Sequence, residues 1–351
     1  MDAEIKAEIL RAAVSAPSAD NSQPWLFHWD GNRLDLGIDP RRSGGISDAR
    51  HVLSDLAVGA CLENILIRGR SLGFEADVQL FPTDDELWPA WLTWKRADKL
   101  DEDLAAAIPD RHTDRRFPWR GPISAADRAR LADRAVEADA ELRWLDDKPL
   151  RRQALRVLRR AETLRFKSPR LHAELFSSVR FDVGWHAAAP EGLPPAALAV
   201  GAPIRPLFQA LRRPGLMAAL NRVGGAHLLG FRSAALPARL SPGLGLICTA
   251  GTERAHVIAA GRALERLWLE ATRQGLALQP FAAAGVMALN FLFVEPSFRP
   301  QIDALQAAMR PLCPGAHGLL FVRLGHAGAP AGWRSGRRTT PAGAVSESFT
   351  V

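Results

Sequence analysis

Two segments of the chain carry residue types suited to binding a flat, anionic small molecule. The first, here called the arginine segment, is Arg111-His112-Thr113-Asp114-Arg115-Arg116-Phe117-Pro118. It places three guanidiniums and a hydroxyl within six residues. Forked cationic donors at this density suit a phosphate monoester better than a hydrophobic core. The alternative that the residues leave open is a solvated, arginine-rich linker between two halves of the chain.

The second segment, here called the proline loop, is Ala16-Pro17-Ser18-Ala19-Asp20-Asn21-Ser22-Gln23-Pro24-Trp25. Its small side chains let the backbone approach a ligand closely, its prolines stiffen it, and Ser18, Asn21 and Gln23 offer hydrogen-bond donors and acceptors. Without a ligand the same residues would form a helix-capping turn. The aromatic residues that begin at its end alternate as in a strand and are expected in the core: Trp25, Phe27 and Trp29.

Both segments resemble signatures of the FMN-dependent nitroreductase family, and the arginine segment is the more specific of the two. The resemblance implies that the FMN phosphate is bound by Arg111, His112, Thr113 and Arg115. It also implies that the ring or the ribityl chain is contacted by Pro17, Ser18 and Asn21. Near the end of the chain, Ser335-Gly336-Arg337-Arg338 resembles the family's terminal K-x-R element, so Arg337 is expected to be a fourth cation.

The order of the two motifs points to one branch of that family. Ordinary members are shorter, carry the arginine motif first, and form dimers in which each subunit lends a loop to the other's flavin. This chain of 351 residues has the reverse order and resembles the single-chain, Acg-like branch. The resemblance implies an α+β nitroreductase-like fold, with two fused halves forming an internal pseudo-dimer around a mixed or antiparallel sheet flanked by helices.

An internal repeat supports this duplication. A shift of 202 residues brings Gly59-Ala60-Cys61-Leu62-Glu63 onto Gly261-Arg262-Ala263-Leu264-Glu265, and Gly73 onto Gly275. The predicted halves are residues 1–105, which supply the proline loop, and 106–351, which hold the arginine segment, a lid insertion at about 165–242 and a C-terminal arm. Because each motif occurs once, we expect one FMN and one vestigial site.

The stretch Gly275-Leu276-Ala277-Leu278-Gln279-Pro280-Phe281-Ala282-Ala283 resembles the family's segment beside flavin N5. Pro280 matches, whereas Ala282 stands where the family usually has glutamate and Ala283 where it has glycine. The resemblance implies an N5 contact from the backbone near Ala282 and Ala283. No side chain is expected to be catalytic, and no metal site is expected because the three cysteines lie far apart without a zinc spacing.

The net charge of +7 would admit a polyanionic partner. Basic residues gather between Lys148 and Arg170, where leucines recur at helical spacing, so an amphipathic helix with a solvated basic face is predicted. Contact with nucleic acid or an anionic membrane is the alternative. No nucleic-acid-binding signature accompanies the charge, so no nucleic-acid partner is expected. The charged start and the lack of a long apolar run predict no membrane span and a cytoplasmic protein.

The resemblance to the nitroreductase family implies an FMN-dependent oxidoreductase that transfers hydride from NAD(P)H through flavin N5 to a nitroarene, quinone or activated alkene. The alternative is a protein that sequesters FMN behind a closed lid and has little reductase activity. The loss of the usual glutamate at Ala282 and the long insertion favour that alternative or a specialised substrate. A monomer with internal pseudo-two-fold symmetry is expected, and further dimerisation is left open.

Overall fold

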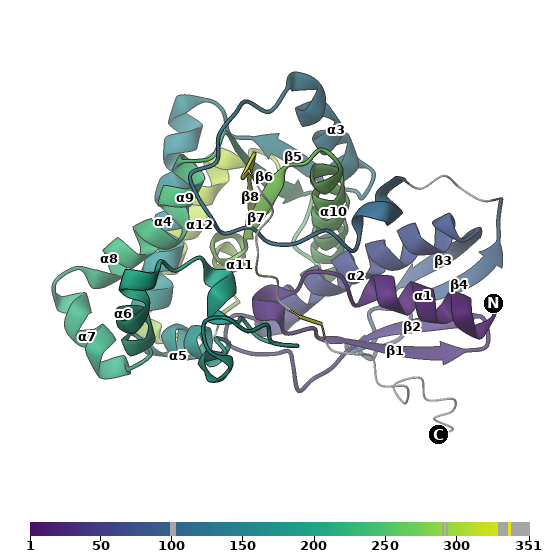
Figure 1. Cartoon of the computed structure of the whole chain (residues 1–351), viewed down its shortest axis with the longest axis horizontal. Helices are drawn as coiled ribbons and strands as arrows, with labels where there is room; N and C mark the ends of the chain where they lie inside the picture. Colours follow the sequence, from purple (N-terminus) through teal and green to yellow (C-terminus); the bar gives the residue numbers. More distant parts are fainter. Residues whose placement is uncertain (99–102, 290, 293, 329–335, 338–351) are drawn as a thin grey trace.

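Two four-stranded antiparallel sheets with the same strand order form the framework of the computed structural model (Figure 1), which describes residues 1–98, 103–289, 291–292, 294–328 and 336–337. The first sheet has the order β1-β2-β4-β3 and comprises β1 (Trp25–Asp30), β2 (Arg33–Ile38), β3 (Phe74–Leu80) and β4 (Ala90–Arg96). The second has the order β5-β6-β8-β7 and comprises β5 (Glu141–Trp144), β6 (Gly243–Thr249), β7 (Ala277–Phe281) and β8 (His317–Gly325). The α+β class is confirmed, and the sheets are antiparallel.

The helices repeat in the same places as the strands. Helices α1 (Ala3–Ala13) and α3 (Ala125–Val136) each precede a sheet. Helices α2 (Val52–Ser71) and α10 (Arg254–Arg273) each connect the second and third strands, both have 20 residues, and they begin 202 positions apart. The duplicated helix that the repeat predicted is therefore confirmed.

Helices α2 and α10 pack against each other at one glycine from each. A Cβ atom on Gly59 would lie 2.1 Å from the carbonyl oxygen of Ile258, and one on Gly261 would lie 2.1 Å from that of Leu56. Ile258 and Leu56 are themselves 202 positions apart, so the two contacts are equivalent. The backbones approach this closely only because neither residue has a side chain.

Each half has its own hydrophobic core, and the central helices contribute to both. Ile258 of α10 belongs to the core of the first half, whereas Val52 and Leu56 of α2 belong to the core of the second. Trp25, Phe27 and Trp29 face the first core, as the strand pattern predicted. The buried residues also include all three cysteines, Cys61, Cys248 and Cys313.

The connections between strands differ most between the halves. Strands β1 and β2 are joined by Gly31 and Asn32, whereas β5 and β6 are joined by residues 145–242. That connection contains α4 (Lys148–Lys167), α5 (Pro169–Ser177), α6 (Arg205–Ala210), α7 (Pro214–Arg222), α8 (Gly225–Gly230) and α9 (Leu236–Arg239). Helix α4 is the predicted basic amphipathic helix, and its apolar face lies in the second core.

Two further helices, α11 (Ala283–Ala288) and α12 (Arg299–Met309), lie between β7 and β8. Within the described part of the chain, no helix is both long and apolar enough to cross a bilayer. The predicted C-terminal arm is described only at residues 336–337, and residues 338–351 of the second predicted half lie outside the described residues.

Candidate functional site

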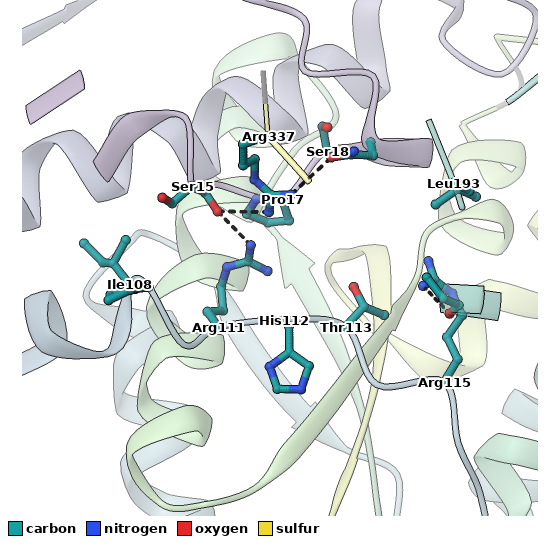
Figure 2. A pocket seen from close by; sticks show the side chains of 13 residues that line it. Ser15, Pro17, Ser18, Ile108, Arg111, His112, Thr113, Arg115, Leu193 and Arg337 are labelled. Carbon is teal, nitrogen blue, oxygen red and sulfur yellow. Dashed lines mark hydrogen bonds between the residues drawn. The ribbon is translucent and has the colours of Figure 1, made fainter. Parts of the chain in front are cut away.

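The arginine segment lies as an extended strip beside β7. Thr113 forms a parallel bridge with Leu278, and the amide of Asp114 donates to the carbonyl of Leu278 at 3.2 Å. Side chains alternate along extended backbone. Accordingly, Arg111, Thr113 and Arg115 point to one side of the strip, and the ring of His112 points to the other (Figure 2).

A buried arginine that the sequence did not single out fixes the backbone of this strip. Arg323 of β8 donates to the carbonyl of Arg116 at 2.7 Å and to the side-chain oxygen of Gln279 at 2.8 Å. Its guanidinium lies 3.7 Å from the ring centroid of Trp119. Burial lowers the pKa of Arg323 to about 9. The available signal was a lone arginine within the apolar run Leu319–Leu324.

Arg111 joins the two halves of the molecule. Its Nε atom lies 3.1 Å from Oε1 of Glu265 on α10, and its Nη2 atom donates to the carbonyl of Ser15 at 2.8 Å, just after α1. The guanidinium also stacks over Trp268, 4.5 Å from the ring centroid. Both charged partners are buried, so Arg111 is held in one orientation.

Glu265 is the second residue that the sequence reasoning missed as a site residue. It is fully buried, and burial raises its pKa to about 7, while the charges of Arg111 and Arg337 act in the opposite direction. Its coincidence with Glu63 in the repeat was visible in the sequence. That coincidence marked duplication without indicating that the carboxyl lies behind the arginine segment.

The proline loop has an uncommon backbone. Asp20, Asn21 and Gln23 have φ angles of 51°, 56° and 50°, in the left-handed region that non-glycine residues rarely adopt. The hydroxyl of Ser18 accepts the backbone amide of Gln23 at 2.9 Å and helps hold this shape. Several strained residues in one short loop are a feature of ligand-binding segments.

The C-terminal arm binds to the same loop. Arg337 donates to Oδ1 of Asn21 and to the carbonyl of Ser15, both at 3.2 Å, and the Asn21 amide donates to the carbonyl of Gly336 at 3.2 Å. Burial, together with the charge of Arg111, lowers the pKa of Arg337 to about 10. Two arginines thus converge on one carbonyl despite their mutual repulsion, which favours an anion between them.

These three pieces enclose a cavity of about 150 Å³. It is lined by eight of the ten predicted cofactor-binding residues: Pro17, Ser18, Asn21, Arg111, His112, Thr113, Arg115 and Arg337. Its other lining residues are Ser15, Ile108, Pro109, Leu193 and Ala197, and none of the thirteen is acidic. Pro280, in β7, and Ala282, just before α11, are outside this lining. Their roles stay predictions.

Residues 190–197, inside the predicted insertion, cover the cavity. Arg115 donates to the carbonyl of Ala197 at 3.2 Å, and the side-chain amide of Gln23 donates to the carbonyl of Pro190 at 2.7 Å. Arg42 and Glu191 form an ion pair at 2.8 Å. Leu193 and Ala197 contribute apolar lining. The insertion therefore forms part of the wall of the cavity, and its role as a lid stays a prediction.

The pseudo-symmetric position in the other half is filled by the protein itself. Glu63, the equivalent of Glu265, is paired with Arg266 and, at 2.8 Å, with Arg262. Arg266 also pairs at 2.6 Å with Glu137, just after α3. Arg266 thus links Glu63 to the end of α3 as Arg111 links Glu265 to the end of α1. Only three residues, 138–140, separate Glu137 from β5, where the first half has the whole proline loop.

Several proteins resemble this chain in sequence, although no family model matches the chain. An uncharacterized protein of Mycobacterium tuberculosis is 26% identical over 92% of this chain and 46% of that protein. A putative NAD(P)H nitroreductase of the same species is 34% identical over 40% of this chain and 42% of that protein. The chain thus aligns with less than half the length of these two relatives.

A third relative extends the likeness over most of both chains. A protein of Mycobacterium tuberculosis named putative NAD(P)H nitroreductase acg is 27% identical to it over 79% of this chain and 80% of its own length. Together with the duplicated α+β fold, this confirms the resemblance that the motifs indicated. The chain therefore resembles the putative nitroreductases, and its likeness to acg over most of both lengths fits the single-chain, Acg-like branch.

Proposed function

We propose that this protein is an FMN-dependent oxidoreductase that takes electrons from NAD(P)H and passes them to an electrophilic small molecule. One observation carries the proposal. The guanidiniums of Arg111, Arg115 and Arg337, with the hydroxyl of Thr113, line one cavity that has no acidic lining residue. The relatives named putative NAD(P)H nitroreductase support the same activity.

The donor set fits the phosphate of FMN. Arginine binds phosphate through paired N–H groups, and each charge-assisted hydrogen bond contributes about 1.5–3 kcal/mol. Three such bonds would provide much of the roughly −8 kcal/mol of a micromolar complex. The burial that lowers the pKa of Arg115 and Arg337 is a cost that a bound phosphate dianion would offset.

The chain's own residues would divide the work of holding the cofactor. Arg111, Thr113 and Arg115 would bind the phosphate from the arginine segment, and Arg337 would bind it from the arm. Bound FMN would supply two-electron transfer between a nicotinamide and an acceptor such as a nitroarene, a quinone or an activated alkene.

The proline loop would hold the rest of the cofactor from the other half of the molecule. Pro17, Ser18 and Asn21 would contact the ring or the ribityl chain, because all three line the same cavity as the arginines. We propose that backbone amides near Ala282 and Ala283 contact flavin N5. Strand β7 lies beside the arginine segment, and these two residues directly follow β7 in the chain. Leu193 and Ala197 would exclude water, which strengthens the electrostatic contacts inside.

We also infer the organisation in which this function operates. Residues 1–105 would form the half that supplies the proline loop, and residues 106–351 the half that supplies the arginine segment, the insertion at about 165–242 and the arm. The matching sheets support a monomer with internal pseudo-two-fold symmetry. We propose that it acts in the cytoplasm.

The test is anaerobic reduction of the FMN-loaded protein by NADPH and by NADH, followed through the visible absorption of the flavin. Rapid bleaching by either nucleotide, and recovery of colour with a quinone or nitroarene, is the result we expect. A protein that binds FMN but keeps its colour would instead be an FMN-sequestering protein, because the residues covering the cavity would then exclude the nicotinamide. A protein that takes up no FMN would contradict the proposed site.

A further inference from the structure

The insertion holds the whole charge excess of the protein. Residues 165–242 contain ten lysines and arginines and three acidic residues, a net charge of +7, and the complete chain also has a net charge of +7. Residues 192–252 contain no aspartate or glutamate. The remainder of the protein is therefore neutral overall. The net positive charge of the chain is concentrated in this one segment.

The same part exposes large apolar side chains. Among the described residues, seven large hydrophobic side chains are exposed, and five of them belong to the insertion: Ile204, Leu207, Val223, Leu228 and Leu240. Val223 and Leu228 are 81% and 69% exposed, at and beyond the end of α7. Single exposed apolar residues are ordinary, but several within one segment mark an interaction surface.

The core of the insertion does not need these side chains. Its own small hydrophobic cluster is formed by Phe166, Phe176, Leu211, Met217 and Ala226. Met217 and Ala226 come from α7 and α8, the helices that flank Val223. The buried side of these helices therefore packs in the core of the insertion, whereas Val223 and Leu228 are exposed to solvent. Figure 1 shows α6, α7 and α8 together at one end of the molecule.

Cations lie next to the exposed apolar groups. Arg222 directly precedes Val223, and Arg212 and Arg213 lie between α6 and α7. His227, beside Leu228, has its pKa lowered first by burial and then by the charges of Lys167 and Arg159 on α4. The cations Lys167 and Arg159 of α4 therefore lie close enough to α8 to act on His227, and basic and apolar side chains occur together in this region.

We propose that this surface, formed by residues 204–228 with the adjoining end of α4, docks on an anionic phospholipid bilayer. Segments that bind in the plane of a membrane combine basic residues with apolar side chains that enter the headgroup region. A basic surface whose residues 204–228 include no aspartate or glutamate is complementary to the negative potential of such a bilayer. Nucleic acid would use the arginines but would gain little from exposed leucine and valine, because those interfaces are more polar.

The test is flotation of the full-length protein with phosphatidylcholine vesicles, with and without phosphatidylglycerol. We expect binding only to vesicles that contain phosphatidylglycerol, and loss of binding when salt is raised from about 0.1 M to about 1 M, where the Debye length falls from about 10 Å to about 3 Å. Equal binding to both vesicle types, or none to either, would overturn the proposal.

Paired variants separate this surface from net charge and from general hydrophobicity. Replacing Arg212, Arg213 and Arg222 with glutamine is expected to lower partitioning roughly a hundredfold, because each cation near such a surface contributes about fivefold. The charge-matched control replaces exposed cations outside the insertion, Arg11, Lys95 and Arg130, with glutamine and should retain most of the binding.

A second set of variants tests the exposed apolar side chains and compares Val223→Asp and Leu228→Asp with Val136→Asp. Val136 serves as the control because it is 66% exposed on α3, outside the insertion. Only the first two should weaken vesicle binding, and all three sites are exposed enough for the fold to be kept, which the melting temperature verifies. If the control variants lose as much binding as the test variants, the surface is misassigned. It is also misassigned if a duplex DNA oligomer competes fully with the vesicles and the Val223 and Leu228 variants bind normally.

Discussion

Arg115 reaches the cavity with a carbonyl of the covering segment as its partner, whereas His112, one position from Thr113, turns its ring to the opposite side (Figure 2). We predict that Arg115→Gln weakens FMN binding about tenfold to a hundredfold, the loss of one charge-assisted bond of roughly 1.5–3 kcal/mol. His112→Gln should change the affinity by less than about threefold, since its ring points away from the side on which Arg111 and Arg115 lie. Fluorescence titration of both variants decides this. Equal losses would mean that side chains on both faces of the strip contact the ligand, which contradicts this arrangement.

Glu265 should make the free energy of unfolding depend on pH. Burial raises its pKa to about 7 from 4.5, so between these values the folded protein keeps a proton that the unfolded chain has lost. The free energy of unfolding should therefore fall as pH rises through this window, by about 3 kcal/mol from this group. Glu265→Gln should remove that part of the slope.

Urea unfolding of the parent protein and of Glu265→Gln across the pH range measures the difference. Burial also raises the pKa of Asp55, to about 6, but Asp55 is present in both proteins and cancels in the comparison. Parallel stability curves for the two proteins would show that Glu265 titrates normally.

The chemistry of single residues was predictable from the sequence only where a motif carried it. The hydrogen-bond donors of the arginine segment and the proline loop are recognisable from the sequence, and the structure brings eight of the predicted residues to one cavity. Glu265 and Arg323 could not be found in that way. Their burial and partners come from residues far along the chain, such as Arg111 for Glu265 and Arg116 for Arg323.

At the scale of elements, the crossing of α2 and α10 depends on two glycines. Gly261→Ala would place a Cβ atom 2.1 Å from the carbonyl oxygen of Leu56, and backbone cannot yield as a side chain can. We predict a loss of about 3 kcal/mol or more, at the upper end of overpacking effects, together with weaker FMN binding. The control is Gly215→Ala, also in a helix, where a Cβ atom would meet nothing within 4 Å.

That control should be neutral or slightly stabilising, by up to about 1 kcal/mol, because alanine favours helix over glycine. Chemical denaturation of the two variants gives the comparison. If Gly261→Ala were as stable as Gly215→Ala, the two helices would have to be further apart than described.

The long helices and the repeat were predictable as elements, because apolar periodicity and glycine stops are local properties. The connection between β5 and β6 was less so. Its irregular part was expected from prolines and glycines, and α4 at its start was predicted as an amphipathic helix. The contacts of Pro190 and Ala197 with the proline loop and the arginine segment join distant segments, and no local pattern encodes them.

At the scale of the molecule, one pseudo-symmetric site holds a cavity and the other holds an ion-pair network. Arg266→Ala should destabilise the fold by about 3–5 kcal/mol, because Glu63 is fully buried and would keep only part of its compensation. It should leave FMN binding nearly unchanged, since Arg266 is not among the cavity's lining residues. Thermal unfolding and FMN titration of this variant together test whether the network is structural. Stronger or additional FMN binding would indicate a second site that Arg266 blocks.

The most direct measurement of the central claim is a calorimetric titration of the cofactor-free protein with FMN and, in parallel, with riboflavin, which has the same ring but no phosphate. Our account predicts one FMN per chain, bound at least about a hundredfold more tightly than riboflavin, because three guanidiniums meet the phosphate. Two FMN per chain, or equal affinities for FMN and riboflavin, would contradict the assignment of Arg111, Arg115 and Arg337 as a single phosphate site.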